Sequence, residues 1–178
     1  MSTSQKGSSS LSDQAYDLLE DRLVNLELAP GSIVSEGTLV EMTGLGRTPV
    51  REAMLRFAYQ GLVEVLPRRG LRITSFDDDS IIQLLEVRRR LERFIVRLAA
   101  VNARDRHRSE MSAIARDLPL AANDSGRFVQ LCRDSDRLLD ECAENPFATA
   151  AASPLRTHCR RLLNQHGEGQ LLAETVKA

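Results

Sequence analysis

The sequence predicts a mainly α-helical protein in two parts: a small N-terminal part of helices with a short sheet, followed by an antiparallel all-helical bundle. Two observations support this prediction. Apolar residues recur at helical spacing through most of the 178 residues, and period-two alternation is confined to one short stretch, 63–73. With 42% hydrophobic and 28% charged residues, the composition is that of a globular protein able to bury a core.

The first predicted helix covers residues 11–26 and ends before Ala29-Pro30-Gly31. Four acids precede Asn25, so this helix is expected to be a scaffold that turns its polar side away from phosphates. Residues 1–10 are polar and serine-rich and are expected to be disordered. The apolar stripe of the helix consists of Leu11, Ala15, Leu19, Leu23 and Leu26.

Two further helices joined by a tight turn are expected next. Ile33 and Val34 can form a short strand that pairs with a later hairpin, residues 36–43 form a helix, and residues 44–46 form the turn. Pro49 suits the first turn of the second helix, where its missing N–H costs nothing, and Thr48 can cap that turn. The buried stripe of this helix is Val50, Ala53, Met54 and Phe57.

Arg47 and Arg51 lie off that stripe, at the start of the helix. A helix that presents such a basic first turn fits the major groove of DNA. There arginine can donate two hydrogen bonds to guanine, and Thr48 and the free amides can reach phosphates. On the helix alone, the alternative that both arginines merely face solvent is equally good.

The segment that follows favours DNA. Residues 63–73 alternate in polarity, which predicts a half-buried β-hairpin with Pro67-Arg68-Arg69-Gly70 at its tip. A basic hairpin after a helix with a basic start is typical of a winged helix-turn-helix, whose wing would lay Arg68 and Arg69 along the backbone or minor groove. Between Gly44 and Arg72 there are six arginines and two acids, in a chain of net charge −1. The predicted partner is double-stranded DNA.

Four segments, in this order and spacing, resemble the N-terminal domain of GntR-type bacterial transcription regulators: LAPGS (28–32), GLGRTPVREA (44–53), GLV (61–63) and PRRG (67–70). The resemblance implies that the operator is contacted from the recognition helix by Arg47, Thr48, Pro49 and Arg51, and from the wing by Arg69 and Gly70. Two positions depart from the family pattern. Gly46 stands where Ser or Thr is common, and Gly37 stands where many members carry a phosphate-contacting Arg or another polar residue, which weakens the case for those two contacts.

The run SFDDDS at residues 75–80 separates the DNA-binding domain, 11–75, from a helical domain, 76–178, because acids favour a helix N-terminus. Residues 76–178 hold sixteen basic and sixteen acidic groups, so they carry no nucleic-acid signature. Helices are expected at 81–102, 108–120, 125–143 and 146–164, with a short piece from Glu168 to the end. The side chains of the first that should face inward are Leu84, Val87, Leu91, Phe94, Ile95 and Leu98.

Asp136 is a carboxylate on the apolar stripe of the helix at 125–143. A buried carboxylate is costly unless it is paired. The favoured interpretation pairs it with Arg88 or Arg89 of the first bundle helix, and the alternative places it in a polar cavity that binds a ligand.

The second part resembles the all-helical FCD effector domain of the FadR branch of the same family, in Val87-Arg88-Arg89-Arg90-Leu91-Glu92, Arg137-Leu138-Leu139 and Asn145-Pro146. The resemblance implies a sensor of small carboxylic acids. The candidate effector pocket consists of Cys132 and Asp136, the two positions that the resemblance singles out, and Arg88, the possible partner of Asp136. It also implies a divalent metal held by an Asp-x3-His pair. Counted from Asn145, that pair falls on Cys132 and Asp136, so neither ligand is retained. The domain looks incomplete, since the sequence stops about where further helices with the remaining histidines would follow.

No metal and no cofactor are predicted. The three histidines, 107, 158 and 166, lie in different segments and suit surface or capping roles, and the three cysteines show no CxxC spacing. An enzyme is disfavoured, because a phosphate-binding loop, HExxH and GxSxG are all missing. With no long apolar run or leader, neither a membrane span nor export is expected, which favours a cytoplasmic location.

These observations predict a homodimeric, sequence-specific DNA-binding regulator, a repressor that responds to a small organic acid. In an alternative, the shortened helical domain only dimerises and senses no ligand. In a third, the wing binds a partner protein instead of DNA.

Overall fold

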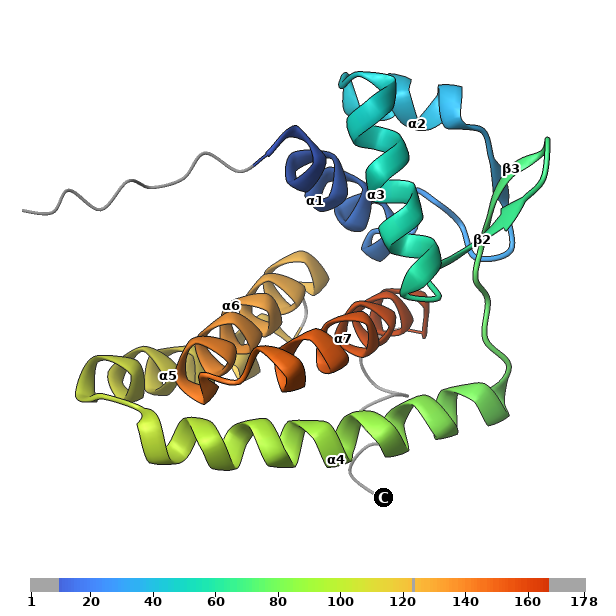
Figure 1. Ribbon diagram of the computed structural model, residues 1–178. Coiled ribbons are helices and arrows are strands. Elements are labelled where there is room, and N and C mark those ends of the chain that lie inside the picture. Colours follow the sequence, from blue (N-terminus) through green and yellow to red (C-terminus); the bar gives the residue numbers. More distant parts are fainter. Residues whose placement is uncertain (1–9, 123, 167–178) are drawn as a thin grey trace, which may run out of the picture. The chain divides into compact units, whose positions relative to one another are not determined.

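The computed structural model describes residues 10–122 and 124–166, and it divides the chain into two compact units, Met1–Ser75 and Phe76–Ala178. Of residues 1–10, which were expected to be disordered, residues 1–9 lie outside the described residues, as does the expected C-terminal piece from Glu168. The expectation is wrong for Ser10, which caps the first helix. Within the described part, none of the helices is apolar over a length that could span a membrane. Figure 1 follows the elements along the chain.

The first unit contains three helices and a small sheet, in the order α1 (Leu11–Val24), β1 (Ile33–Val34), α2 (Glu36–Thr43), α3 (Arg47–Tyr59), β2 (Val63–Leu66) and β3 (Gly70–Ile73). The sheet is antiparallel with β3 in the middle, between β1 and β2. Val34 lies opposite Leu71 in this sheet, and Val63 lies opposite Ile73. The predicted pairing of β1 with the hairpin is therefore confirmed.

The core of this unit lies between α1, α3 and the hairpin. Leu19, Leu23, Phe57 and Leu71 are all buried in one cluster, and the rings of Tyr16 and Phe57 stack with centroids 4.5 Å apart. The stripe predicted for α1 is wrong at one end, since Leu11 is 58% exposed. It stands in the first turn, directly after Ser10, whose hydroxyl accepts the N–H of Asp13 and caps the helix.

The start of α3 also differs from the prediction. The helix begins at Arg47 with Gly46 as its N-cap, and no side chain accepts a hydrogen bond there. Thr48 is already inside the first turn, so it cannot be the cap. Pro49 stands third in the helix, where its missing N–H is still free of cost.

The second unit contains α4 (Asp78–Asn102), α5 (Asp105–Asp117), a 3-10 turn η1 (Leu118–Ala121), α6 (Ser125–Ala143) and α7 (Pro146–His166). Asp77 caps α4 by accepting the N–H of Ser80 at 2.9 Å. Helix α5 begins three residues before its predicted start, because His107 helps to cap it. Both α6 and α7 pack along α4, and α5 packs on α6 (Figure 1).

The buried face of α4 is rotated from the one the sequence predicted. Ile81, Leu84, Ile95 and Ala99 are buried against α6 and α7. The expected inward positions of Val87 and Phe94 are wrong, since they are 49% and 48% exposed. Both lie about 100° round the helix from the buried line. Together with Val101 they form an exposed apolar row at seven-residue intervals.

Candidate functional site

The first turn of α3 is exposed. Arg47, Thr48 and Arg51 are exposed, and Pro49 is half-buried. The opposite face of the same helix is anchored by four buried side chains, Val50, Ala53, Met54 and Phe57. The helix is therefore fixed by its apolar face and offers its basic first turn outward, as the pattern of residues predicted.

Not all arginines of this region are available to a partner. Arg56 donates to Asp13 at 2.9 Å and lies 4.1 Å over the ring of Tyr16. Arg72 donates to Glu64 across the hairpin at 3.0 Å. The charges of these two arginines are therefore already paired within the unit. The charge count of the sequence could not separate them from the rest, because their acidic partners lie 43 and 8 residues away.

The side chains of four arginines in this unit have no ion-pair or hydrogen-bond partner within the described residues: Arg47, Arg51, Arg68 and Arg69. The first two stand at the start of α3, and the other two stand at the exposed tip of the hairpin. The cations that remain free are thus the ones that the sequence singled out for DNA.

The hairpin tip depends on backbone conformations that side chains rarely adopt. Gly70 has a φ of 103°, and Arg68 has a φ of 62°. A Cβ atom on Gly70 would lie only 2.3 Å from the carbonyl oxygen of Val34. Gly70 is therefore needed for the close approach of β3 to β1. This structural requirement explains a glycine here whether or not its backbone also meets DNA.

The two glycines that depart from the family pattern are both exposed. Gly46 leaves the amides of the first turn of α3 without a side-chain acceptor, and Gly37 lies on α2. Neither contributes a polar side chain to this surface.

The helical unit holds a second concentration of charge, in its interior. The acid of Asp136 is bound by two arginines of α7: Arg160 donates to it at 2.7 Å, and the Nε atom of Arg156 lies 3.4 Å from it. The sequence predicted that Asp136 pairs with Arg88 or Arg89 of α4. That prediction is wrong, because the arginines that bind Asp136 belong to α7. The sequence could not reveal this, because it fixes which side of a helix is buried but not which neighbour faces it.

Arg156 is the centre of this cluster. Its guanidinium binds both oxygens of Glu92 on α4, at 2.7 and 3.0 Å, and both oxygens of Asp140 on α6, at 2.8 Å each. Its side chain is only 3% exposed. Arg88 lies 3.6 Å from Glu92. The cluster thus links α4, α6 and α7, and we call its six members the arginine network: Arg88, Glu92, Asp136, Asp140, Arg156 and Arg160.

The pKa directions reflect this environment. Burial raises the pKa of Glu92, but the hydrogen bonds and charge of Arg156 outweigh burial, and the net pKa is below its usual value. For Asp136, burial prevails over Arg156 and Arg160, and the pKa is raised. Burial lowers the pKa of Arg156, yet Glu92, Asp136 and Asp140 raise it above its usual value overall. Arg156 is therefore fixed in its charged form.

The residues of this unit do not fit the divalent metal that the resemblance implies. Among the described residues, no three His, Cys, Asp or Glu side chains gather to hold an ion. Cys132 and Asp136 occupy the positions expected for two ligands, but Asp136 already binds two arginines, whose positive charge would repel a cation. His107 instead accepts the N–H of Arg104 at 3.1 Å, a capping role, and His158 meets the edge of the Phe76 ring.

Of the three residues predicted for an effector pocket, the structure brings two into the arginine network. Arg88 and Asp136 are joined through Glu92 and Arg156, while Cys132 is half-buried on α6. The central member, Arg156, was missed. Its spacing of four residues from Arg160, on a helix that contains no acidic residue, was the available signal.

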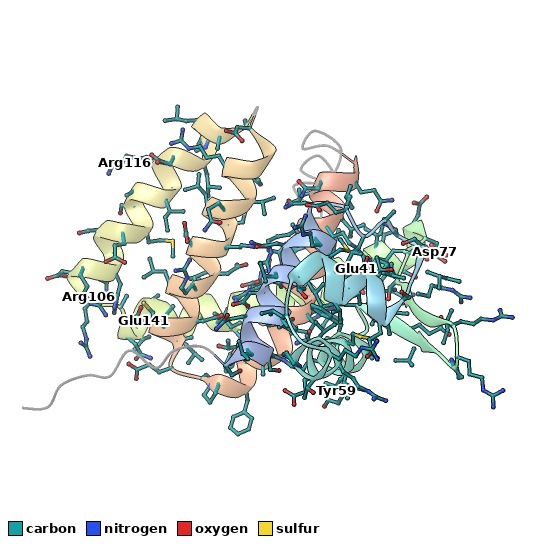
Figure 2. All side chains as sticks on the ribbon, turned by 90° about the horizontal axis from the view of Figure 1, so that it is seen from above. Glu41, Tyr59, Asp77, Arg106, Arg116 and Glu141 are labelled. Atoms are coloured by element: carbon teal, nitrogen blue, oxygen red, sulfur yellow. The ribbon has the colours of Figure 1, made fainter. Side chains whose placement is uncertain are left out.

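Outside the network, charged side chains of this unit pair at the surface. Figure 2 shows Arg106 of α5 and Glu141 of α6 pointing toward one another, and these two form an ion pair. Arg116, further along α5, points away from the unit.

Comparison with known proteins agrees with both units. The GntR family of bacterial regulatory proteins matches residues 11–73, and the FCD domain matches residues 83–177. An uncharacterised HTH-type transcriptional regulator of Streptomyces ambofaciens is 42% identical over 62 residues, 35% of this chain and 26% of the relative. The HTH-type transcriptional repressor GlaR of Escherichia coli is 23% identical over 145 residues, 80% of this chain and 62% of GlaR.

The structure resembles that of E. coli McbR/YncC, with a TM-score of 0.78 and 22% identity, over 96% of this chain and 82% of the other. At this identity the likeness shows the shared fold. The chain spans about a quarter to three fifths of the length of the two curated relatives described above. The two family matches together cover nearly all the described residues, and they indicate a transcriptional regulator rather than an enzyme. The chain belongs to the GntR family of bacterial regulatory proteins, in the branch that carries an FCD domain.

Proposed function

We propose that this regulator binds an operator in double-stranded DNA through the first turn of α3 and the tip of the hairpin. One observation carries the proposal: Arg47, Arg51, Arg68 and Arg69 are left without partners within the described residues, while their neighbours Arg56 and Arg72 are paired. An exposed, unpaired guanidinium gives up little when it binds a phosphate or a base edge.

The two pairs of arginines have different tasks in this proposal. In the major groove, Arg47 and Arg51 can each donate a bidentate pair of hydrogen bonds to O6 and N7 of guanine, which reads sequence. Thr48 and the uncapped amides of the first turn can bind phosphates and fix the position of the helix. Arg68 and Arg69 neutralise phosphates or enter the minor groove, which adds affinity more than specificity.

We propose further that the regulator is a homodimeric repressor. A homodimer on a two-fold symmetric operator is supported by the exposed apolar row of α4, Val87, Phe94 and Val101, which gives a second copy a surface to cover. Repression is supported by the name of GlaR. In the alternative, the helical unit only dimerises.

A response to a small organic acid completes the proposal. Within the arginine network Arg88 and Asp136 already have ionic partners, so an acid at that place would compete with Glu92 for Arg88. An effector that binds without such competition needs a different cation.

The test of DNA binding uses duplexes selected from a random pool by the 178-residue chain. Arg47→Ala and Arg51→Ala should each weaken binding to the selected site by about 1–3 kcal/mol, or roughly 5- to 150-fold, because each removes a bidentate pair of hydrogen bonds to a base. Arg116→Ala is the matched control, since it removes an exposed arginine from α5 (Figure 2).

Arg68→Ala and Arg69→Ala should weaken binding to all duplexes alike. Each should also reduce the slope of log affinity against log salt by about one, because one phosphate is then no longer neutralised by the protein. Unchanged affinity in both α3 variants would refute the proposed recognition helix. Binding that varied little with salt would favour a protein partner for the wing.

A further inference from the structure

Arg161 of α7 is a buried cation without an anion. Its side chain is among the largest fully buried ones, and the residue is 1% exposed. Its Nε and Nη1 atoms have no hydrogen-bond partner, and no ion pair joins it to a carboxylate in the described part of the chain. Burial alone lowers its pKa to about 10, so it remains charged at neutral pH.

The neighbouring arginines do not share this condition. Arg88, Arg156 and Arg160 face three carboxylates, those of Glu92, Asp136 and Asp140, so the arginine network is balanced charge for charge. Arg161 lies on a different side of α7, about 100° round the helix from Arg160. Arg161 therefore does not belong to the arginine network, and no carboxylate of that network compensates its positive charge.

The guanidinium of Arg161 lies over an aromatic ring that packs on an apolar cluster. Its guanidinium carbon lies 5.5 Å from the centroid of the Phe76 ring, and the same ring meets His158 edge-on at 4.7 Å. Phe76 also packs on the cluster of Ile81, Leu84, Cys159 and Leu162. A ring face attracts a cation, but it offers less than the hydration that a buried guanidinium has lost.

We infer that Arg161 is the binding residue for a small organic anion, a carboxylate with an apolar body, at the junction of α7 with Phe76. The planar guanidinium donates in parallel to the two oxygens of a carboxylate, and such bidentate pairs are strong where water is excluded. An apolar body suits the Phe76 ring and the apolar cluster on which that ring packs. The inference rests on the proposed response to an organic acid and gives that response a position distinct from Cys132 and Asp136.

The position of this site suggests how binding could reach DNA. Phe76 is the first residue of the helical unit and follows Ser75, the last of the DNA-binding unit. An anion that draws the Arg161 guanidinium toward itself changes the packing of that group on the Phe76 ring. The effect would therefore begin at the residue that starts the helical unit.

The test measures the thermal midpoint of the full chain in sodium benzoate, sodium propionate and sodium phosphate, against sodium chloride at equal ionic strength. At ten or more times the Kd, benzoate or propionate should raise Tm by about 2–6 °C.

Arg161→Met should abolish this rise and, by removing an unpaired charge, should itself fold with an equal or higher Tm. Arg161→Lys keeps the positive charge but lacks the planar guanidinium that donates to both carboxylate oxygens. Its Tm should therefore rise less with benzoate or propionate. Arg93→Met, an exposed arginine of α4, should respond as the parent does.

Three results would overturn the inference. One is that no carboxylate raises Tm of the parent above chloride; another is that Arg161→Met responds as strongly as the parent. The third is that Arg161→Met has a clearly lower Tm than the parent, because Arg161 would then be paired within the protein. A rise with phosphate alone would contradict the assignment of a carboxylate. Operator affinity of the parent, measured without added acid, separates a failure here from a failure of the proposed DNA binding.

Discussion

Gly70 illustrates how one residue can decide the shape of the wing. Its φ of 103° and the 2.3 Å approach of a hypothetical Cβ to the Val34 carbonyl oxygen exclude any side chain without movement of β1 or β3. The residue therefore supports Arg68 and Arg69 by fixing the hairpin that carries them.

Gly70→Ala should destabilise the first unit by about 3 kcal/mol or more, because it combines a strained φ with a backbone clash. The measurement is chemical denaturation followed by circular dichroism. Gly44→Ala is the matched control, since Gly44 also has a positive φ, 67°, but a Cβ there would meet no atom within 4 Å. Equal losses in the two variants would show that the approach to Val34 is unimportant.

Arg156 is the second residue with a large expected effect. Arg156→Met should cost about 3–5 kcal/mol, since it leaves Glu92 and Asp140 partly buried without their shared partner. Arg156→Lys should recover little of this loss, because one ammonium cannot bind two carboxylates bidentately. The surface pair of Arg106 and Glu141 offers a control: Arg106→Met should cost about 0–1 kcal/mol.

A metal chelator should leave Tm of the parent unchanged, because the described residues gather no set of metal ligands. A fall in Tm on adding the chelator would contradict this expectation.

At the level of elements, α3 has no side chain that accepts a hydrogen bond from the amides of its first turn. Its N-cap is Gly46, with backbone angles of −66° and 164° that a side chain adopts easily, and a Cβ there would meet the Pro49 ring at an ordinary 3.8 Å. The first-turn amides are thus left for water or a ligand.

Gly46→Ser should stabilise the protein by about 0.5–1 kcal/mol, through a new side-chain acceptor and a less flexible unfolded chain. A thermal scan checks the direction. The same hydroxyl could bind a phosphate, so operator affinity is expected to stay equal or rise. A fall in Tm would mean that the cap geometry differs from the one described.

How well the sequence predicted these elements depended on where the determining contacts lie. The wing and α3 were predicted because proline, glycine and alternating polarity act within a few residues of one another. The cap of α3 was misplaced, because Thr48 and Gly46 are both acceptable starts before Pro49. The exposure of Val87 and Phe94 and the partner of Asp136 depend on how α4, α6 and α7 meet, and no local pattern contains that information.

At the level of the whole molecule, the arginine network makes stability depend on pH. Glu92 has a pKa below its usual 4.5 in the folded state, so the unfolded chain binds the proton more readily. Its contribution to the free energy of unfolding is therefore complete above about pH 4.5. That contribution is lost as the pH falls through the lower pKa that Glu92 has in the folded state. Asp136 acts in the opposite sense, since its pKa is raised.

Glu92→Gln isolates the first of these groups. The variant should be less stable than the parent at pH 6, and the difference should shrink as the pH falls from about 5 to 3, because the parent then loses the same charge. Urea denaturation at several pH values measures the difference. A gap that stayed constant over this range would show that the charge of Glu92 is not what stabilises the unit.

The connection between the units is short, and most of its residues make contacts within one unit or the other. Strand β3 ends at Ile73, and Asp77 already caps α4. Thr74 is bonded through its N–H and hydroxyl to Leu62 and Gly61, and Phe76 belongs to the apolar cluster of α4 and α7. A chimera that exchanges one of the two units should therefore be joined at Ser75, where a graft leaves the hydrogen bonds of Thr74 and the packing of Phe76 intact.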